Sequence, residues 1–281
     1  MRSSFGIAAC VLLPTLLCCC DSNQRYMTRE RLNRGLVIIL PGIEGEGPLN
    51  YDIRRGLLAS GVYRGLPIHS WGRPVPIAGP LLNQMDIIGN RLAAAHIADI
   101  VASYQKDYPG RPVHLIGHSG GGGIAVFAAE ALPEGVSVDG LILLSPSISS
   151  AYDLTKAMAH CRNGILNIFT RSDVGLLVIG TTLAGNVDGI RGPAAGALGF
   201  DRPGPRSPPE KINAYQRLYQ LELTKITDEG LAGAHGYSTR WTFIARYIVP
   251  WLLSPSWPPK DAPGVAEAIE LQAKALAQAT R

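Results

Sequence analysis

Short apolar runs, each followed by turn residues and then by a longer segment with helical spacing, are the feature that most limits the possible fold. There are five of them: Leu36–Leu40, Leu66–Trp71, Val113–Ile116, Gly140–Leu144 and Ile165–Phe169. Runs that are apolar on both faces suit strands of a parallel sheet that helices cover on each side. The alternation therefore predicts a doubly wound α/β fold.

Helical spacing and turn residues organise the rest of the chain. The longest apolar stripe stops at Pro109-Gly110, which is typical of a helix end. We expect helices over residues 85–108, 239–253 and 263–279, and a last strand within 215–224. Glycine and proline are frequent between residues 174 and 210, which predicts an inserted flap with little regular structure. The connection from residue 145 to residue 164 is too short for a large helical lid.

The first twenty residues have the layout of a secretory signal. A short cationic start precedes the apolar segment Phe5–Leu17, which is too short to span a bilayer comfortably. The sequence Leu17-Cys18-Cys19-Cys20 resembles a bacterial lipoprotein processing site, with a leucine three positions before Cys20; Cys19 is the second possibility. We expect residues 1–20 to be a signal peptide of the lipoprotein type and a lipid on Cys20 to anchor the protein to a membrane outside the cytoplasm, in a bacterial envelope. Ordinary secretion is the alternative.

The remainder divides into a polar tether, residues 21–33, and one domain, residues 34–281. Over 281 residues, 46% are apolar and 17% charged, which is enough for one large core. The net charge of +4 is mild, and no basic run interleaved with aromatic residues predicts a nucleic-acid partner. Cys161 is the only cysteine after the leader, so we expect it to be a packing residue and not part of a disulfide or zinc site. We expect a monomer.

The stretch Gly117-His118-Ser119-Gly120-Gly121 lies between the third apolar run and a helical segment. Glycines two residues either side of a serine permit a sharp strand-to-helix turn, because backbone segments there come too close for a side chain. Such a turn raises the Ser119 hydroxyl above the sheet and places the Gly120 N–H at a helix N-terminus, where it can donate to an oxyanion. A phosphate-binding loop is the competing interpretation, but it would need a lysine after its last glycine.

With this motif between a predicted strand and helix, the chain resembles the α/β-hydrolase superfamily over roughly residues 35–253. The resemblance implies an α/β-hydrolase fold in which Ser119 is a nucleophile. It also implies an acid and a histidine base that follow the serine in that order, with no metal or cofactor.

The base predicted from this order is His235, in a loop after the last candidate strand and before the final core helix. Four histidines precede or adjoin the serine and read as structural, and a fifth lies in a helical stretch: His69, His96, His114, His118 and His160.

The predicted acid is Asp173, which follows the run that ends at Phe169. Asp153, one strand earlier, is the alternative acid, and Asp188 in the flap is a third candidate.

In this superfamily a second oxyanion donor comes from the loop after the early strand, here Leu40 to Gly47. We expect the backbone N–H of Ile43 to pair with that of Gly120; Glu44 is the alternative donor position. Pro41 stands where a histidine is common. Trp71 and Tyr152 are candidates for lining an acyl pocket.

The function implied is a serine hydrolase that cleaves a small-molecule or lipid ester, a thioester or an amide through an acyl-enzyme, most simply a carboxylesterase or lipase. An acyltransferase that uses the same triad, or a non-catalytic scaffold that binds a ligand, are the alternatives.

Overall fold

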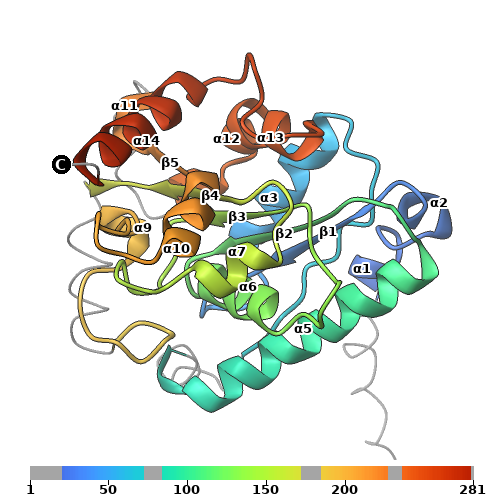
Figure 1. Ribbon diagram of the computed structural model, residues 1–281. Helices are drawn as coiled ribbons and strands as arrows, with labels where there is room; N and C mark the ends of the chain where they lie inside the picture. The colour runs from blue at the N-terminus through green and yellow to red at the C-terminus, as the bar shows by residue number, and fades with distance from the viewer. Residues whose placement is uncertain (1–20, 73–83, 172–184, 227–235, 280–281) are drawn as a thin grey trace, which may run out of the picture.

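The protein is described by a computed structural model that covers residues 21–72, 84–171, 185–226 and 236–279. In this part of the chain five parallel strands form one sheet in the order β1-β2-β3-β4-β5. They are β1 (Leu36–Leu40), β2 (Val113–His118), β3 (Gly140–Leu144), β4 (Ile165–Phe169) and β5 (Leu218–Glu222). Figure 1 shows helices on both faces of the sheet, which confirms the predicted α/β class.

Alternation along the strands divides the core into two clusters. In β1, Leu36, Ile38 and Leu40 belong to one cluster, whereas Val37 and Ile39 belong to the other. Because successive side chains of a strand point to opposite faces, each strand supplies both layers of the core. The first cluster packs under α5 (Ile87–Asp107), α6 (Gly120–Glu130) and α7 (Thr155–Ala159). The second packs under α3 (Pro48–Ala59), α12 (Trp241–Phe243), η5 (Ile244–Ile248), α13 (Val249–Leu253) and α14 (Val265–Ala279).

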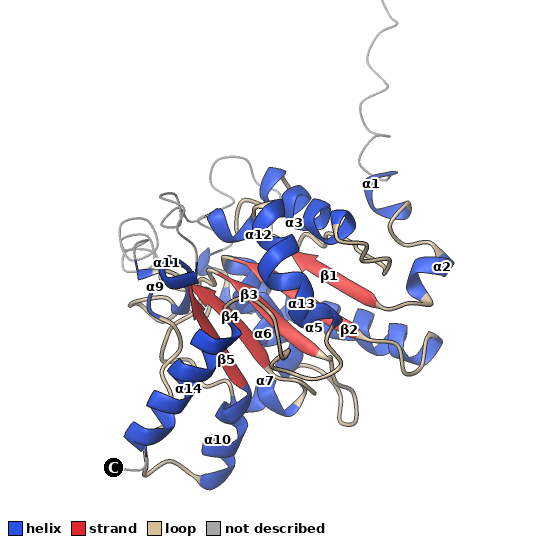
Figure 2. Ribbon diagram, turned by 90° about the horizontal axis from the view of Figure 1, so that it is seen from above, coloured by secondary structure: helices blue, strands red, loops and turns tan. Residues whose placement is uncertain are grey.

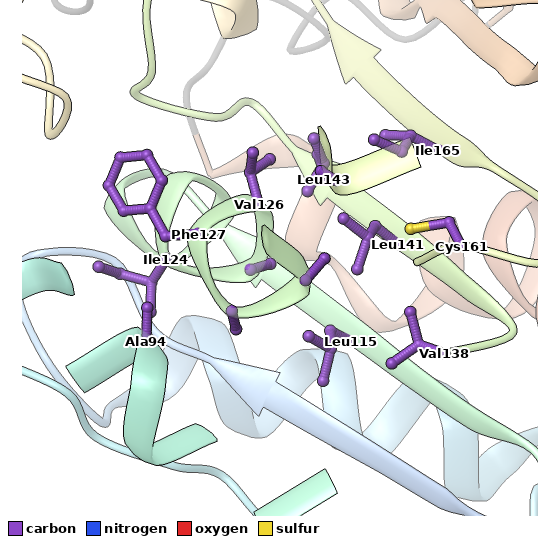
Figure 3. Close-up of a cluster of buried hydrophobic side chains, with 14 of the residues drawn as sticks. Ala94, Leu115, Ile124, Val126, Phe127, Val138, Leu141, Leu143, Cys161 and Ile165 are labelled. Carbon is purple, nitrogen blue, oxygen red and sulfur yellow. The ribbon is translucent and has the colours of Figure 1, made fainter. Parts of the chain in front are cut away.

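The central helix α6 is buried along its whole length. Figure 3 shows Ile124 beside Ala94 of α5 on one side of this helix, and the strand residues Leu115 and Leu141 on the other. Cys161 lies in the same cluster, where burial raises the pKa of its thiol to about 12. This position confirms the prediction that Cys161 is a packing residue.

The predicted strand Leu66–Trp71 forms only two isolated bridges with β1, Leu36 to Gly65 and Ile39 to Ile68. Four hydrogen bonds of a parallel ladder are present: Gly65 N to Gly35 O, Val37 N to Gly65 O, Ile39 N to Pro67 O and His69 N to Ile39 O. The bond that would complete the ladder needs an N–H at position 67, and proline has none. The prediction of a full strand is therefore corrected to an edge segment that follows β1.

The segment 21–33, predicted to be a tether, folds onto the domain as α1 (Asp21–Gln24) and α2 (Arg29–Leu32). The Asn23 side-chain amide donates to Ile68 O at 2.9 Å, and its Oδ1 accepts from Ile68 N at 3.1 Å. Farther along, Leu66 N donates to Tyr26 O, and Tyr104 Oη donates to Leu32 O. These contacts cover the edge of the sheet, so the tether prediction does not describe residues 21–33.

The predicted flap is described from residue 185 onward, and residues 172–184 lie outside the described residues. Its described part contains α9 (Ala195–Leu198) and α10 (Pro209–Ala214), which lead through η3 (Tyr215–Arg217) into β5. Val187 N donates to Ser147 O and Ala195 N to Ile148 O, and both side chains are fully buried. This part is packed into the core, contrary to the prediction of an irregular cover. Between residues 145 and 164 the structure has the single short helix α7.

A buried amide pair holds this segment to the sheet. Asn167 Nδ2 in β4 donates to Gln220 Oε1 in β5 at 3.1 Å. Gln220 also serves both backbone groups of Phe200: its Oε1 accepts from Phe200 N at 2.6 Å and its Nε2 donates to Phe200 O at 3.1 Å. No helix among the described residues has the length and hydropathy needed to cross a membrane.

We expect Gln220→Met to lower the free energy of unfolding by about 2–4 kcal/mol, because it leaves the Phe200 N–H and carbonyl and the Asn167 amide without this partner. Urea unfolding followed by circular dichroism measures the change. The matched control is Gln216→Met at an exposed position in η3, just before β5, for which we expect a change within about 0.5 kcal/mol. Equal stability of the two variants would contradict a structural role for the amide pair.

Candidate functional site

Ser119 occupies a sharp turn between β2 and α6. Its backbone angles are φ 52° and ψ −121°, in a region that residues other than glycine rarely adopt. Its N–H donates to Leu144 O at 3.0 Å, and its carbonyl accepts from Gly122 N and Ser147 N at 3.0 and 2.9 Å. Backbone hydrogen bonds from the neighbouring elements therefore hold the strained conformation, and the predicted strand-turn-helix is confirmed.

The glycines either side of Ser119 are required by close backbone contacts. A Cβ atom on Gly117 would lie 2.3 Å from Gly121 O. A Cβ atom on Gly121 would lie 2.3 Å from both Leu40 O and Pro41 O, at the end of β1. The first turn of α6 therefore rests directly on the loop that follows β1.

This contact brings together the two predicted oxyanion donors. A Cβ on Gly120 would be 2.8 Å from Ile43 Cγ2 and 3.0 Å from Trp71 Cζ2, so these side chains lie against the first residue of α6. The Trp71 Nε1–H donates to Pro41 O at 2.7 Å and so fixes the loop that carries Ile43. Trp71 thus has a second role that its sequence context did not reveal, beside its predicted place at an acyl pocket.

Glu44 lies in the same loop and turns toward the buried His118, with 3.6 Å between Glu44 Oε1 and His118 Nδ1. His118 is 1% exposed and points into the fold. This pairing supports the expectation that His118 is structural and that Glu44 has no catalytic role.

The other early histidines also occupy structural positions. His114 is buried in β2, where burial, followed by the charge of Arg64, lowers the pKa of its imidazole to about 3. His69 and His96 face each other with ring centroids 5.5 Å apart. At the end of α7, His160 Nδ1 lies 2.8 Å from Val136 O.

Asp153, the alternative acid, is held at the surface. Its Oδ1 accepts from Thr155 N and Oγ1 at 2.9 and 2.6 Å, and its Oδ2 pairs with Lys211 Nζ at 2.8 Å. Partial burial acts to raise its pKa, but the hydrogen bonds from Lys211 and Thr155 outweigh it and bring the pKa to about 2. The Asp153 carboxylate is therefore bound to the first residue of α7, Thr155, and to Lys211.

Asp188 and Tyr152 likewise have local partners. The Asp188 carboxylate accepts from Ser149 N and Ile190 N at 3.3 and 3.2 Å and so shapes a turn. Tyr152 packs on Phe127 and donates to Glu130 at 2.8 Å, at the opposite end of α6 from the turn at Ser119. The interpretation of Tyr152 as an acyl-pocket residue has no support in these contacts.

Asp173 and His235 both lie outside the described residues, and so does Cys20. Asp173 follows β4 in the chain and His235 follows β5. Both strands end at the same edge of the sheet as β2, which precedes Ser119, because parallel strands share their carboxyl edge. Four residues beyond β4 the chain reaches Asp173, and α11 (Leu223–Ile226) follows β5 on the way to His235.

A contact between two serines anchors the segment after His235. Ser238, in η4 (Tyr237–Thr239), has its Oγ 3.3 Å from Ser145 Oγ. Ser145 follows β3 directly and has a positive φ of 47°, which is unusual for a residue other than glycine. Sequence reasoning missed both residues, since nothing in their local pattern differs from an ordinary loop serine.

Comparisons with known proteins agree with this geometry over part of the chain. Residues 91–191, which include the turn at Ser119, match the family model described as "Serine aminopeptidase, S33". Human monoglyceride lipase is 50% identical over 48 residues, which are 17% of this chain and 15% of the lipase. The monoglyceride lipase of Rattus norvegicus is 52% identical over a stretch of the same length and coverage. The chain thus matches under one sixth of the length of these relatives.

Solved structures with a similar arrangement were also found. Lipase B of Aspergillus fumigatus aligns with a TM-score of 0.44 and 14% identity, over 90% of this chain and 57% of that one. A cutinase-like protein from Cryptococcus sp. aligns with a TM-score of 0.41 and 13% identity, over 78% and 95% of the two chains.

We expect Gly121→Ala to destabilise the protein by about 3 kcal/mol, because its methyl group would overlap the Leu40 and Pro41 carbonyls and push the loop away from α6. The urea midpoint measures this change. Gly204→Ala is the matched control, since nothing lies within 4 Å of its Cβ position, and it should leave stability unchanged or raise it by up to about 1 kcal/mol. An unchanged midpoint for Gly121→Ala would contradict the close contact.

Proposed function

We propose that the chain is a member of the α/β-hydrolase superfamily, on the strength of its parallel sheet and the family match over residues 91–191, and that it is a serine esterase that cleaves carboxylic esters, including lipid esters, through an acyl-enzyme. The observation that carries the proposal is the strained Ser119 at the junction of β2 and α6, with the loop after β1 pressed against Gly120. Such a turn places a serine hydroxyl beside backbone N–H groups, which is the arrangement that acyl transfer requires.

In the proposed mechanism His235 takes the proton of the Ser119 hydroxyl as its oxygen attacks the ester carbonyl. Asp173 holds the imidazole and stabilises its cation. The backbone N–H groups of Ile43 and Gly120 donate to the oxyanion until the C–O bond breaks and His235 returns the proton to the leaving alcohol. Water, deprotonated by His235, then attacks the acyl-enzyme and releases the carboxylic acid and free Ser119.

Two features support Asp173 and His235 as the partners of Ser119. Their strands, β4 and β5, follow β3 in the sheet, so the loops that carry them leave from the same edge as the serine. The Ser145–Ser238 contact holds the chain just after His235 beside β3, and Ser147 in turn donates to Ser119 O. Asp153, in contrast, is already bound to Lys211.

An apolar acyl group is supported by side chains at the N-terminal end of α5. Ile88 is 76% exposed and Leu92 is 67% exposed, values that are high for residues of this kind. α5 runs toward the start of β2, so its N-terminal end lies at the carboxyl edge of the sheet. Nearby, Gln84 Nε2 donates to Ser147 Oγ at 2.7 Å, which links this end to the turn at Ser119. The likeness of a short stretch to monoglyceride lipases agrees with such a substrate.

Labelling with a fluorophosphonate, which reacts with activated serines, tests the proposal. We expect the purified chain to be labelled, and Ser119→Ala to abolish labelling. His235→Ala and Asp173→Asn should slow labelling by about 100-fold or more, since removal of a triad member costs several orders of magnitude in rate.

Asp153→Asn is the matched control, because its carboxylate contacts Thr155 and Lys211, and it should label at the wild-type rate. Hydrolysis of p-nitrophenyl esters of increasing acyl length then defines the pocket. A folded wild-type protein that is neither labelled nor active on these esters would refute the esterase, and loss of labelling in Asp153→Asn alone would reassign the acid.

We also propose that the enzyme works outside the cytoplasm and is held to a membrane by a lipid on Cys20. The support is the layout of residues 1–20, with Leu17 three positions before that cysteine. In a bacterial host, Cys20→Ser should release the protein from the membrane fraction, whereas Cys10→Ser should not. Mass spectrometry of the wild-type N-terminus should find a diacylglyceryl cysteine, and an unmodified N-terminus would contradict the anchor.

A further inference from the structure

An open groove of about 580 Å³ lies between α1 and α3, on the part of the molecule that carries the β1 edge of the sheet. Figure 2 shows α1 beside this edge, with α3 over the neighbouring face. The groove is lined by Arg25, Tyr26, Tyr51, Arg54 and Arg55, with Leu58 on its apolar side. None of these residues belongs to the proposed catalytic machinery.

Among the described residues that line the groove, three are arginines and none is acidic, so this lining carries positive charge. Glu46 is the acidic residue whose charge acts on Arg54. Burial lowers the pKa of the Arg54 guanidinium, and the group remains cationic at neutral pH because arginine titrates far above it. A groove of this composition attracts anions.

The guanidinium groups are held in place before any ligand binds. Arg54 is only 5% exposed, and its Nη1 donates to Asn23 Oδ1 at 3.0 Å. Its guanidinium lies 4.1 Å from the centre of the Tyr26 ring, and that of Arg25 lies 4.8 Å from the same ring. Arg55 is fixed in the same way against Trp241, at 4.8 Å. For Arg25 and Arg55, stacking covers the face of the guanidinium, so an anion would be bound through the N–H groups at its edge. Binding an anion here therefore costs little side-chain ordering.

The chemistry of the lining indicates a phosphate ester. Planar guanidinium groups bind phosphate oxygens in a bidentate manner, which an aliphatic ammonium cannot do. Tyr51, which is 46% exposed, and Leu58 offer ring and aliphatic surface to the organic part of such a ligand. We propose that this groove binds a phosphate ester of the kind found in glycerophosphate headgroups, with the phosphate held by Arg25, Arg54 and Arg55 and the organic part against Tyr51. The proposal does not depend on the esterase activity.

The test uses the full chain in a neutral detergent and two probes that present the same chemistry from different sources. Calorimetry measures the affinity for soluble glycerol 3-phosphate. Flotation measures binding to phosphatidylglycerol vesicles, with phosphatidylcholine vesicles as the reference for charge-independent attachment. We expect binding of at least one anionic probe, weakened by added salt because ionic contacts are screened.

The double variant Arg25→Gln/Arg55→Gln changes only exposed residues, so it should fold as the wild type does. We expect it to bind the anionic probe about tenfold more weakly or worse, since a charge-assisted hydrogen bond contributes roughly a factor of ten or more. Arg54→Lys keeps the charge but loses the planar group, and it should also bind more weakly. The matched control Arg206→Gln/Lys260→Gln removes two exposed positive charges elsewhere and should bind as the wild type does.

Binding of the soluble ester alone would identify a free phosphate compound as the ligand, and binding of vesicles alone would identify a lipid headgroup; both support the site. Failure of the wild type to bind either anionic probe would overturn the proposal. Equal binding by the wild type and the Arg25→Gln/Arg55→Gln variant would overturn it as well, as would an equal loss in the control variant. Fluorophosphonate labelling of the same samples reports separately on the esterase.

Discussion

The approach of α6 to the end of β1 is the contact on which the rest of the site depends. Gly121 sits so close to the Leu40 and Pro41 carbonyls that any side chain would separate them. This one contact positions the turn at Ser119 and at the same time sets the loop with Ile43 against Gly120. The proposed nucleophile and the proposed oxyanion donors therefore share one packing constraint. The strain at Ser119 is sustained because neighbouring backbone groups, such as Leu144 O and Ser147 N, bond to it.

Much of this arrangement could be predicted from the sequence, because it follows from local rules. A strand with apolar residues on both faces, such as β1, can only be buried between two layers. Glycines at positions 117 and 121 have one simple steric explanation when they flank a serine. Cys161 could be assigned to the core because no second cysteine follows the leader to form a disulfide with it.

The features that could not be predicted depend on contacts between distant residues. Asn23 binds the backbone of Ile68 from 45 positions away, so a polar segment that reads as a tether becomes part of the fold. Gln220 captures Phe200 in a similar way and draws a glycine- and proline-rich segment into the core. Pro67 is visible in the sequence. Its effect on the strand, however, depends on whether the N–H at position 67 would have to pair with β1, and only the structure shows that pairing. The assignment of acid and base rests on chain order, and the structure contributes the surroundings of Asp153 and of the segment after His235.

The two hydrogen bonds between Asn23 and Ile68 have a mechanical consequence. They run between an amide side chain near the start of the described chain and the backbone of the segment that follows β1. A pull applied at residue 21 would reach the sheet through these bonds after a few residues of slack, and it would be resisted by the edge segment and β1 together. A load applied at this end of the described chain would therefore fall on the edge of the sheet and not on a flexible linker.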